Sequence, residues 1–375
     1  MKKIMVVFGT RPEAIKMAPL VKALKKDKNL NPIVVVTAQH REMLDQVLET
    51  FDIEPDYDLN LMKKGQTLSS ITSSALIGLE DVIKEVEPDM ILVHGDTTTT
   101  FVGALAAFYQ QVDIGHVEAG LRTYQKYAPY PEELNRQMTT KLADLHFAPT
   151  DLARNNLIKE NIEENKIYIT GNTAIDALNT TVDDNYVSEI IKNHPDKRVI
   201  LLTAHRRENI GKPMESIFDG IKQIVDDNED VVVIYPMHRN PKVRELANKY
   251  LTHERIELIE PLDVLDFHNF AAKSHLILTD SGGVQEEAPS LGKPVLVLRD
   301  VTERPEGVEA GTLKIVGTDS KAIYDATQEL LDNSEAYENM SKANNPYGDG
   351  YASERICGAI AHYYGFNTNR PEEFK

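Results

Sequence analysis

The chain has almost no cysteine, no tryptophan and no long apolar stretch. Cys357 is the one cysteine among 375 residues, so neither an internal disulfide nor a cysteine-rich zinc site can form, and we expect a reducing, cytoplasmic setting. The apolar run from Ile4 to Phe8 is shorter than the ~7–15 residues of a signal-peptide core. No run approaches the ~18 residues of a membrane span, so we expect no membrane partner.

Positive charge is also scarce. Asp and Glu number 59 against 41 Lys and Arg, which gives a net charge of −18. No basic field is available for a nucleic-acid backbone, so we expect no nucleic-acid partner, and an anionic ligand must be met in a local pocket. With 41% hydrophobic and 27% charged residues and no biased tract, the chain is typical of a globular protein of about two domains.

Short apolar, β-branched runs recur along the chain, and most are followed by a stretch of helix length. Continuous apolar runs are typical of parallel strands covered by helices on both faces. They predict strands at Ile4–Phe8, Ile33–Thr37, Met90–His94, Ile114–Val117, His146–Ala148, Val199–Thr203, Val231–Tyr235, Ile256–Ile259, Leu276–Thr279, Val295–Leu298 and Lys314–Val316. We therefore expect an α/β protein of two Rossmann-like, doubly wound parallel-sheet domains.

The domain break is predicted near residue 185, within the polar stretch from Thr180 to Lys197 that contains several turn residues. The first domain then covers residues 1–185 and the second 186–352. A last amphipathic helix begins near Ser353, and we expect the segment 353–375 to pack back on the first domain. The polar tail from Asn367 to Lys375 is expected to fray.

Ligands of doubly wound sheets bind beyond the carboxyl ends of the strands. After the first run, Gly9-Thr10-Arg11 opens a helix that carries Lys16, and backbone N–H groups with two nearby cations suit a phosphate. A capped turn with solvated charges explains these residues equally well.

A second turn, Ser281-Gly282-Gly283, leads from a strand directly onto a helix start. Two glycines let a diphosphate approach the backbone closely, and Glu287 lies one helical turn further on, where it can bond ribose hydroxyls. The motif lacks the ending of a P-loop and the spaced glycines of a dinucleotide site, which argues against an NTPase and against NAD. Arg299 and Arg304 flank the next loop and either reach the same phosphates or form surface salt bridges.

Ionisable side chains follow several strand ends in both halves. Folding does not require such convergence, whereas acid–base chemistry does, although Asp96 by itself is better explained as a helix N-cap. The residues are His94 and Asp96, His116 and Glu118, Glu132, His205 and His238. Their spacing does not bring a set of metal ligands to one side, so we expect no metal.

Seven segments together resemble the bacterial non-hydrolysing UDP-N-acetylglucosamine 2-epimerases, nearly end to end. They are residues 8–16, 37–41, 94–100, 116–122, 205–208, 280–287 and 345–350. The resemblance implies a GT-B architecture with a cleft between two domains, UDP held mainly by the second, and a homodimer. It also implies interconversion of UDP-GlcNAc and UDP-ManNAc, without a cofactor, for cell-surface polysaccharides such as teichoic acid or capsule.

The same resemblance implies roles for individual residues. Its UDP contacts correspond to Arg11, Lys16, His205, Phe270 at the uracil, Ser281, Gly282 and Gly283 at the phosphates, Glu287 at the ribose, and Arg304. Its catalytic carboxylates correspond to Asp96, Glu118 and Glu132, with His205 beside them. A second, activating UDP-GlcNAc site corresponds to Gln39, Glu42, Glu132, Arg206 and His238.

The sequence departs from the family at this second site. Glu42 stands where several relatives have Gln, and Gly65 stands where some have Arg. An added carboxylate and a missing guanidinium both weaken the binding of a diphosphate, so activation by substrate is expected to be weak unless Lys63 or Lys64 substitutes.

The reaction predicted from the resemblance is elimination of UDP with loss of the C2 proton, followed by re-addition through a 2-acetamidoglucal. A buried carboxylate with a raised pKa would suit the proton transfer. Three other functions remain open at this point: a GT-B glycosyltransferase that uses a UDP-sugar, a hydrolysing epimerase that releases free ManNAc, and a nucleotide-sugar sensor without turnover. A cluster of carboxylates beside a diphosphate argues against the sensor.

Overall fold

The computed structural model describes residues 1–37, 41–61, 65–302 and 304–375. Tertiary contacts divide the chain into two compact units. Unit 1 comprises Met1–Thr180 and Tyr347–Lys375, and unit 2 comprises Thr181–Pro346. The chain thus leaves unit 1 once and returns to it for its last segment.

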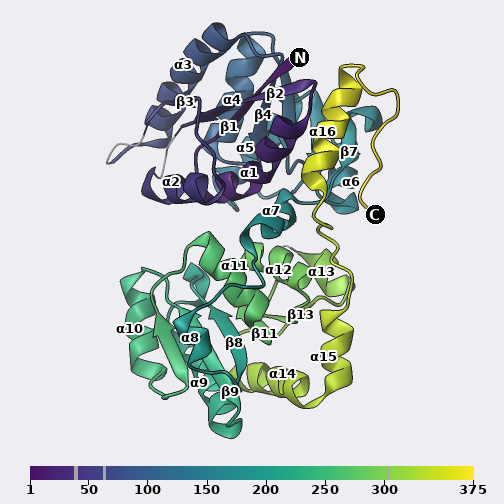
Figure 1. Cartoon of the computed structure of the whole chain (residues 1–375). Helices are drawn as coiled ribbons and strands as arrows, with labels where there is room; N and C mark the ends of the chain where they lie inside the picture. Colours follow the sequence, from purple (N-terminus) through teal and green to yellow (C-terminus); the bar gives the residue numbers. More distant parts are fainter. Residues whose placement is uncertain (38–40, 62–64, 303) are drawn as a thin grey trace. The chain divides into compact units, whose positions relative to one another are not determined.

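Unit 1 is built on a parallel sheet with the strand order β3-β2-β1-β4-β5-β6-β7 (Figure 1). The strands are β1 Lys2–Phe8, β2 Leu30–Val36, β3 Tyr57–Asp58, β4 Met90–His94, β5 Asp113–Val117, β6 Leu145–Ala148 and β7 Ile167–Ile169. The helices are α1 Arg11–Lys26, α2 Arg41–Thr50, α3 Leu68–Val86, α4 Thr98–Tyr109, α5 Glu132–Leu142, α6 Asp151–Lys159, α7 Thr173–Thr181 and α16 Ala352–Tyr363, with a 3-10 turn at Glu164–Lys166.

The central strands of unit 1 are apolar throughout because both of their faces are covered. Every residue of β4 is buried. Ile91 and Val93 pack with the buried faces of α3 and α4, while α16 lies against α1. Burial of each such aliphatic side chain contributes about 1.5–3 kcal/mol, so the sheet supports the strand ends rigidly.

Unit 2 repeats this architecture, with the strand order β10-β9-β8-β11-β12-β13 (Figure 1). Its strands are β8 Arg198–Thr203, β9 Val231–Pro236, β10 Ile256–Ile259, β11 Leu276–Thr279, β12 Val295–Val297 and β13 Leu313–Ile315. Its helices are α8 Glu189–Lys192, α9 Lys212–Asp227, α10 Pro241–Tyr250, α11 Val264–Lys273, α12 Gly282–Glu287, α13 Pro305–Glu309, α14 Ser320–Asp332 and α15 Ser334–Ser341, with 3-10 turns at Arg207–Asn209 and Ala288–Leu291.

Two separate cores flank the sheet of unit 2. Ile200 and Leu202 of β8 pack with Phe218 of α9, while Leu201 between them packs with Phe270 of α11 on the other face. The two parallel-sheet α/β units confirm the predicted fold class. None of the helices in the described ranges has the length and apolar character that crossing a bilayer requires.

Two strands and the tail differ from the sequence-based expectation. The short edge strands β3 and β7 were not predicted. The prediction of a frayed tail is wrong, because the tail is bonded to β7 and to the turn before it: Phe374 N donates to Ile169 O at 2.8 Å, and Arg370 donates to Asn165 O at 3.1 Å. The Arg370 guanidinium also lies 3.9 Å from the ring centre of Tyr168, which covers this edge of the sheet.

Candidate active site

Four elements of unit 1 converge on the Glu118 carboxylate, which directly follows β5. Lys16 of α1 forms an ion pair with it, and Asn172, just before α7, donates to Oε2 at 3.2 Å. His94, the last residue of β4, places Nε2 3.6 Å from the same oxygen. Glu118 itself adopts a left-handed backbone with φ of 60°. A non-glycine residue rarely adopts this conformation, and when it does the position is often functional.

The surroundings of Glu118 favour its ionised form. Burial opposes ionisation, but the positive charge of Lys16 and the contacts with His94 outweigh it, so the pKa of Glu118 lies well below its usual range. Glu118 is therefore a carboxylate at neutral pH. This result corrects the expectation that a buried catalytic carboxylate here would have a raised pKa.

Asp96 and Glu132 differ in how they are held. Asp96, after β4, forms an ion pair with Arg136, a buried residue of α5, and accepts a hydrogen bond at its backbone oxygen from Asn135 Nδ2 at 3.0 Å. Glu132 is the first residue of α5 and is half-buried. Its carboxylate makes no hydrogen bond or ion pair with another residue of the described ranges.

The turn after β1 uses its backbone N–H groups internally. Glu13 is buried, and its Oε2 accepts from Gly9 N at 3.1 Å and from Thr10 N at 2.8 Å, while Oε1 accepts from Thr97 Oγ1 at 2.8 Å. These two N–H groups are therefore bonded within the turn and are not available to a phosphate. Arg11, half-buried at the start of α1, and Lys16 further along the same helix remain its predicted phosphate contacts.

Two further imidazoles lie deeper in unit 1. His116 Nε2 lies 2.7 Å from Gly95 O. His146 on β6 is the residue opposite His116 on the neighbouring strand β5. Burial lowers the pKa of each to about 3, so both are neutral and structural. Within residues 1–37, 41–61, 65–302 and 304–375, no group of three or more His, Cys, Asp or Glu side chains has the arrangement of a metal site.

In unit 2, Asp280 organises the ends of β8 and β11. It is fully buried, and its Oδ2 accepts from the backbone N–H groups of His205 and Arg206, both at 2.8 Å. The His205 ring stacks on His238, which follows β9, with ring centres 5.3 Å apart and planes inclined by 12°. The predicted residues His205, Arg206 and His238 therefore share one edge of the sheet.

The Ser-Gly-Gly turn directly follows Asp280. Ser281 is the N-cap of α12, and Gly282 and Gly283 are its first residues. A Cβ atom on Gly282 would lie 3.1 Å from the guanidinium carbon of Arg304, so only glycine leaves that group undisturbed. Arg304 donates to Glu286 Oε1 at 2.9 Å, which fixes its guanidinium beside the start of the helix.

The two residues assigned to the nucleoside differ in exposure. Glu287 Oε2 lies 3.4 Å from Nε2 of the buried His268. Phe270 is only 2% exposed and packs edge-on against Tyr186 in the core. The structure thus gives Phe270 a core position rather than an open face for uracil, and Phe267, on the same helix α11, packs partly buried against the same core.

The residues of the predicted activating site are only partly described. Gln39 and the side chain of Glu42 on α2 lie outside the described part of the chain. Gly65 has φ of 76°, and no atom of the described residues lies within 4 Å of the position that a Cβ atom would take there. A Cβ atom at residue 65 would therefore clash with no described residue. The positive φ nevertheless disfavours any residue other than glycine.

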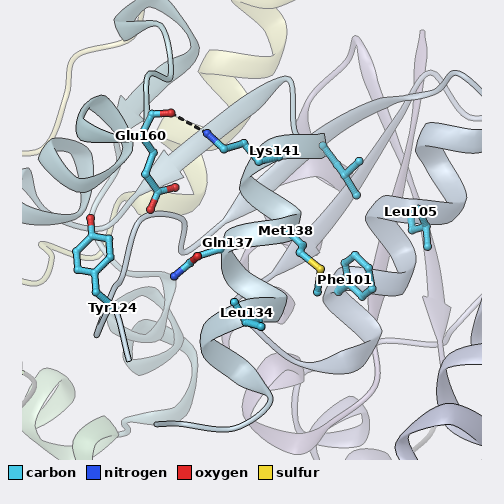
Figure 2. A pocket seen from close by; sticks show the side chains of 9 residues that line it. Phe101, Leu105, Tyr124, Leu134, Gln137, Met138, Lys141 and Glu160 are labelled. Carbon is cyan, nitrogen blue, oxygen red and sulfur yellow. Dashed lines mark hydrogen bonds between the residues drawn. The ribbon is translucent and has the colours of Figure 1, made fainter. Parts of the chain in front are cut away.

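An apolar hollow of about 670 Å³ lies elsewhere on unit 1, along α4 and α5 (Figure 2). It is lined by Phe101, Leu105, Tyr124, Leu134, Gln137, Met138, Lys141, Leu142 and Glu160. Lys141 Nζ donates to Glu160 O at 2.7 Å at its rim. None of the predicted site residues lines the hollow. Its lining is mainly apolar, as in a contact surface, and differs from the polar clusters at the strand ends.

Sequence reasoning missed three partners of the predicted residues: Arg136, Asn172 and Asp280. Asn172 follows β7, a strand that was not predicted, so its place at a strand end was not recognised. Asp280 stands between a predicted strand and the Ser-Gly-Gly turn, which is a signal that could have identified it. Arg136 lies within α5, and nothing in its local sequence indicates that it pairs with Asp96.

Comparison with known proteins gives one consistent result. A family profile described as UDP-N-acetylglucosamine 2-epimerase matches residues 22–361. The UDP-N-acetylglucosamine 2-epimerase of Bacillus subtilis (strain 168) is 62% identical over 373 residues, covering 99% of this chain and 98% of that protein.

Solved structures agree. A UDP co-structure of MnaA from S. aureus is 62% identical, covers 100% of both chains and superposes with a TM-score of 0.92. The UDP-GlcNAc 2-epimerase from Neisseria meningitidis bound to UDP-GlcNAc is 49% identical, covers 96% of this chain and 99% of that one, and gives a TM-score of 0.86. With matches of this extent in both sequence and fold, the chain belongs to the UDP-N-acetylglucosamine 2-epimerase family.

Proposed function

We propose that this protein interconverts UDP-GlcNAc and UDP-ManNAc by inverting C2 of the sugar. Family membership supports the activity. The observation that carries the chemistry is Glu118, an ionised carboxylate with a side chain only 12% exposed that Lys16, His94 and Asn172 hold at a strand end. A carboxylate in this state is deprotonated, which is the form that accepts a proton, although its lowered pKa makes it a weaker base.

The proposed reaction is an elimination followed by an addition. C2 is not next to a carbonyl, so its proton is too weakly acidic for simple removal and return. A carboxylate takes the C2 proton while the bond from C1 to the diphosphate oxygen breaks and UDP departs with the electron pair, which leaves a 2-acetamidoglucal. UDP then adds back to C1, and C2 receives a proton on its other face. The sequence is redox-neutral and consumes no co-reactant.

We assign the proton transfers to Asp96, Glu118 and Glu132. Glu118 is the group that is ionised by its surroundings, and this supports a role as proton acceptor. Asp96 is paired with Arg136, whereas the Glu132 carboxylate is less constrained.

We assign UDP to Arg11, Lys16, His205, Ser281, Gly282, Gly283, Glu287 and Arg304. Negative charge grows on the departing diphosphate in the transition state, and fixed cations and N–H donors stabilise it there. Arg304 beside the start of α12 and Arg11 at the start of α1 support this assignment. Lys16 serves Glu118 as well, which links the cation to the acid–base chemistry.

We also propose a weakened activating site for UDP-GlcNAc that includes Gln39, Glu42, Glu132, Arg206 and His238. Glu42 adds negative charge and Gly65 removes a guanidinium relative to several members of the family. Both changes reduce diphosphate affinity. We place the reaction in the cytoplasm as a supply of ManNAc for cell-surface polysaccharide, since a single cysteine suits a reducing compartment.

A homodimer formed through the apolar hollow of Figure 2 completes the proposal. Met138 on α5, which lines the hollow, is 39% exposed, and Phe108 on α4, which follows the lining residues Phe101 and Leu105 at helical spacing, is 56% exposed. Large exposed apolar patches mark contact surfaces. We expect Phe108→Asp to shift the molecular mass measured by light scattering from dimer to monomer, and Phe366→Asp, at an exposed aromatic near the C-terminus, to leave it unchanged.

The activity is tested by incubating the protein with UDP-GlcNAc in deuterated water and following the sugar H1 and H2 signals by proton NMR. We expect UDP-ManNAc to accumulate with deuterium at C2. Unchanged UDP-GlcNAc despite measurable binding would refute the proposal, and release of UDP only on addition of a sugar acceptor would identify a glycosyltransferase instead.

A further inference from the structure

Asp280 is a fully buried carboxylate whose two oxygens have different surroundings. Oδ2 accepts three hydrogen bonds, from the backbone N–H groups of His205 and Arg206 at 2.8 Å and from Asn209 Nδ2 at 3.1 Å. Oδ1 accepts no hydrogen bond from the described residues, yet it lies 3.4 Å from Nδ1 of His205. The hydrogen-bonding capacity of Oδ2 is therefore filled, whereas Oδ1 faces the imidazole of His205.

Folding alone does not explain the charge at this position. An amide oxygen in place of Oδ2 could accept the same backbone donors, and a neutral side chain avoids the cost of burying a charge. A negative charge at Asp280 would also repel the diphosphate that we assign to the adjacent Ser-Gly-Gly turn. The part of the surroundings that gains from a carboxylate rather than an amide is the imidazole in front of Oδ1.

We infer that Asp280 is a positioning residue that holds His205 in the tautomer with the proton on Nδ1, so that Nε2 is presented to the substrate. The inference rests on the proposed function, because it assumes that His205 meets the nucleotide sugar. A carboxylate that orients an imidazole through Nδ1–H also stabilises the imidazolium form, as in other acid–base sites. The stacked ring of His238 limits rotation of His205 from one side.

Asp280 also links the imidazole to the turn assigned to the diphosphate. Its backbone oxygen accepts from Arg206 Nε at 3.2 Å, and the next residue, Ser281, is the N-cap of α12. A single residue thus sets the positions of the His205 ring, the Arg206 guanidinium and the start of the Ser-Gly-Gly turn.

The charged groups around His205 act in opposite directions. Burial lowers its pKa, the carboxylates of Asp280 and Glu208 raise it, and the positive charges of His238 and Arg206 lower it. The net effect is a pKa below the usual value for histidine. Removing the charge of Asp280 therefore lowers the pKa of His205 further and moves the pH–rate limb that belongs to His205 to lower pH.

The test uses Asp280→Asn, with Asp176→Asn as the matched control. Asp176 is also a buried carboxylate, but it accepts from the backbone N–H groups of Ala352 and Ser353 at the start of α16, in unit 1. Tautomer and pKa of His205 are read from its ring ¹⁵N shifts, assigned with His205→Gln. We expect Asp280→Asn to show the Nε2–H tautomer and to lower kcat about 100-fold, within the usual range for acid–base groups. Asp176→Asn should retain wild-type values for both.

Several outcomes would overturn the inference. Wild-type ¹⁵N shifts that place the proton on Nε2 refute it without any variant, so a failure of Asp280→Asn to fold does not protect it. Unchanged shifts and pKa in the folded variant refute it as well. If the wild-type protein shows no epimerisation, the proposed function fails, while the ¹⁵N shifts still decide whether Asp280 orients His205.

Discussion

The two units carry their polar residues at the same place, the carboxyl ends of parallel strands, but they hold them by different means. In unit 1, carboxylates are fixed by side-chain cations: Glu118 by Lys16, and Asp96 by Arg136. In unit 2, the buried Asp280 carboxylate is fixed mainly by backbone N–H groups, and it faces an imidazole. The same architecture therefore supports two different electrostatic environments.

This difference matches the two tasks that we propose, which are proton transfer at C2 and binding of the diphosphate. Carboxylates that are kept ionised by a cation are present in the deprotonated form that accepts a proton from carbon. Imidazole, guanidinium and helix-start N–H groups suit a diphosphate that gains negative charge as it leaves. Substitutions of the unit 1 carboxylates should therefore mainly affect proton exchange, and substitutions at the Ser-Gly-Gly turn and Arg304 of unit 2 should mainly affect UDP binding.

The largest effect is expected for Glu118→Gln in unit 1. The amide cannot take the C2 proton, so we expect kcat to fall about 10³-fold while the Kd for UDP changes little. Deuterium incorporation at C2, measured by NMR, and UDP binding, measured by calorimetry, separate the two effects. Retention of full turnover would remove Glu118 from the chemistry.

In unit 2, Arg304→Ala is expected to weaken UDP binding about 10–100-fold, since a hydrogen bond to a charged group contributes about 1.5–3 kcal/mol. The variant also leaves Glu286, whose side chain is 5% exposed, without this partner. The double variant Arg304→Ala/Glu286→Gln controls for that buried charge. Equal UDP affinity in wild-type and double-variant proteins would contradict the assignment of Arg304 to the diphosphate.

A smaller effect, a shift in pH dependence, is expected for Lys16→Met. Lys16 lowers the pKa of Glu118, so its removal raises that pKa, and Glu118 then becomes protonated at a higher pH than in the wild type. The acid limb of the kcat–pH profile should move to higher pH. The low pKa of Glu118 also contributes to the free energy of unfolding of the wild type. This contribution is lost as the pH falls through that pKa. An unmoved acid limb would show that Glu118 does not determine it.

The smallest effect concerns Gly65 in unit 1. Because its φ is 76°, Gly65→Arg and Gly65→Ala should each lower the free energy of unfolding by about 1 kcal/mol, measured by urea denaturation. Gly65→Arg alone adds a guanidinium, so it alone should increase the cooperativity of the rate with UDP-GlcNAc concentration. If both variants show the same cooperativity as the wild type, the expectation of an activating site weakened by Gly65 is wrong.

The strands show where sequence patterns are informative. The buried central strands β4, β8 and β11 were predicted because continuous apolar runs have few alternative structures. The edge strands β3 and β7 contain two and three residues, too few for any periodicity to show. The tail was misjudged for a related reason: its polar composition gives no sign that Arg370 would bond to the backbone beside β7.

The sequence by itself determined which residues stand at the strand ends, because hydrophobic runs define the strands and parallel strands place their carboxyl ends on one edge. Glu118, Asp96, His205 and the Ser281–Gly283 turn follow from that rule. The tertiary structure alone decided their partners and protonation. Lys16 and Glu118 are 102 residues apart in the chain, and His205 and Asp280 are 75 apart. A pKa depends on distances and burial that exist only after the chain has folded, so no local pattern could have given it.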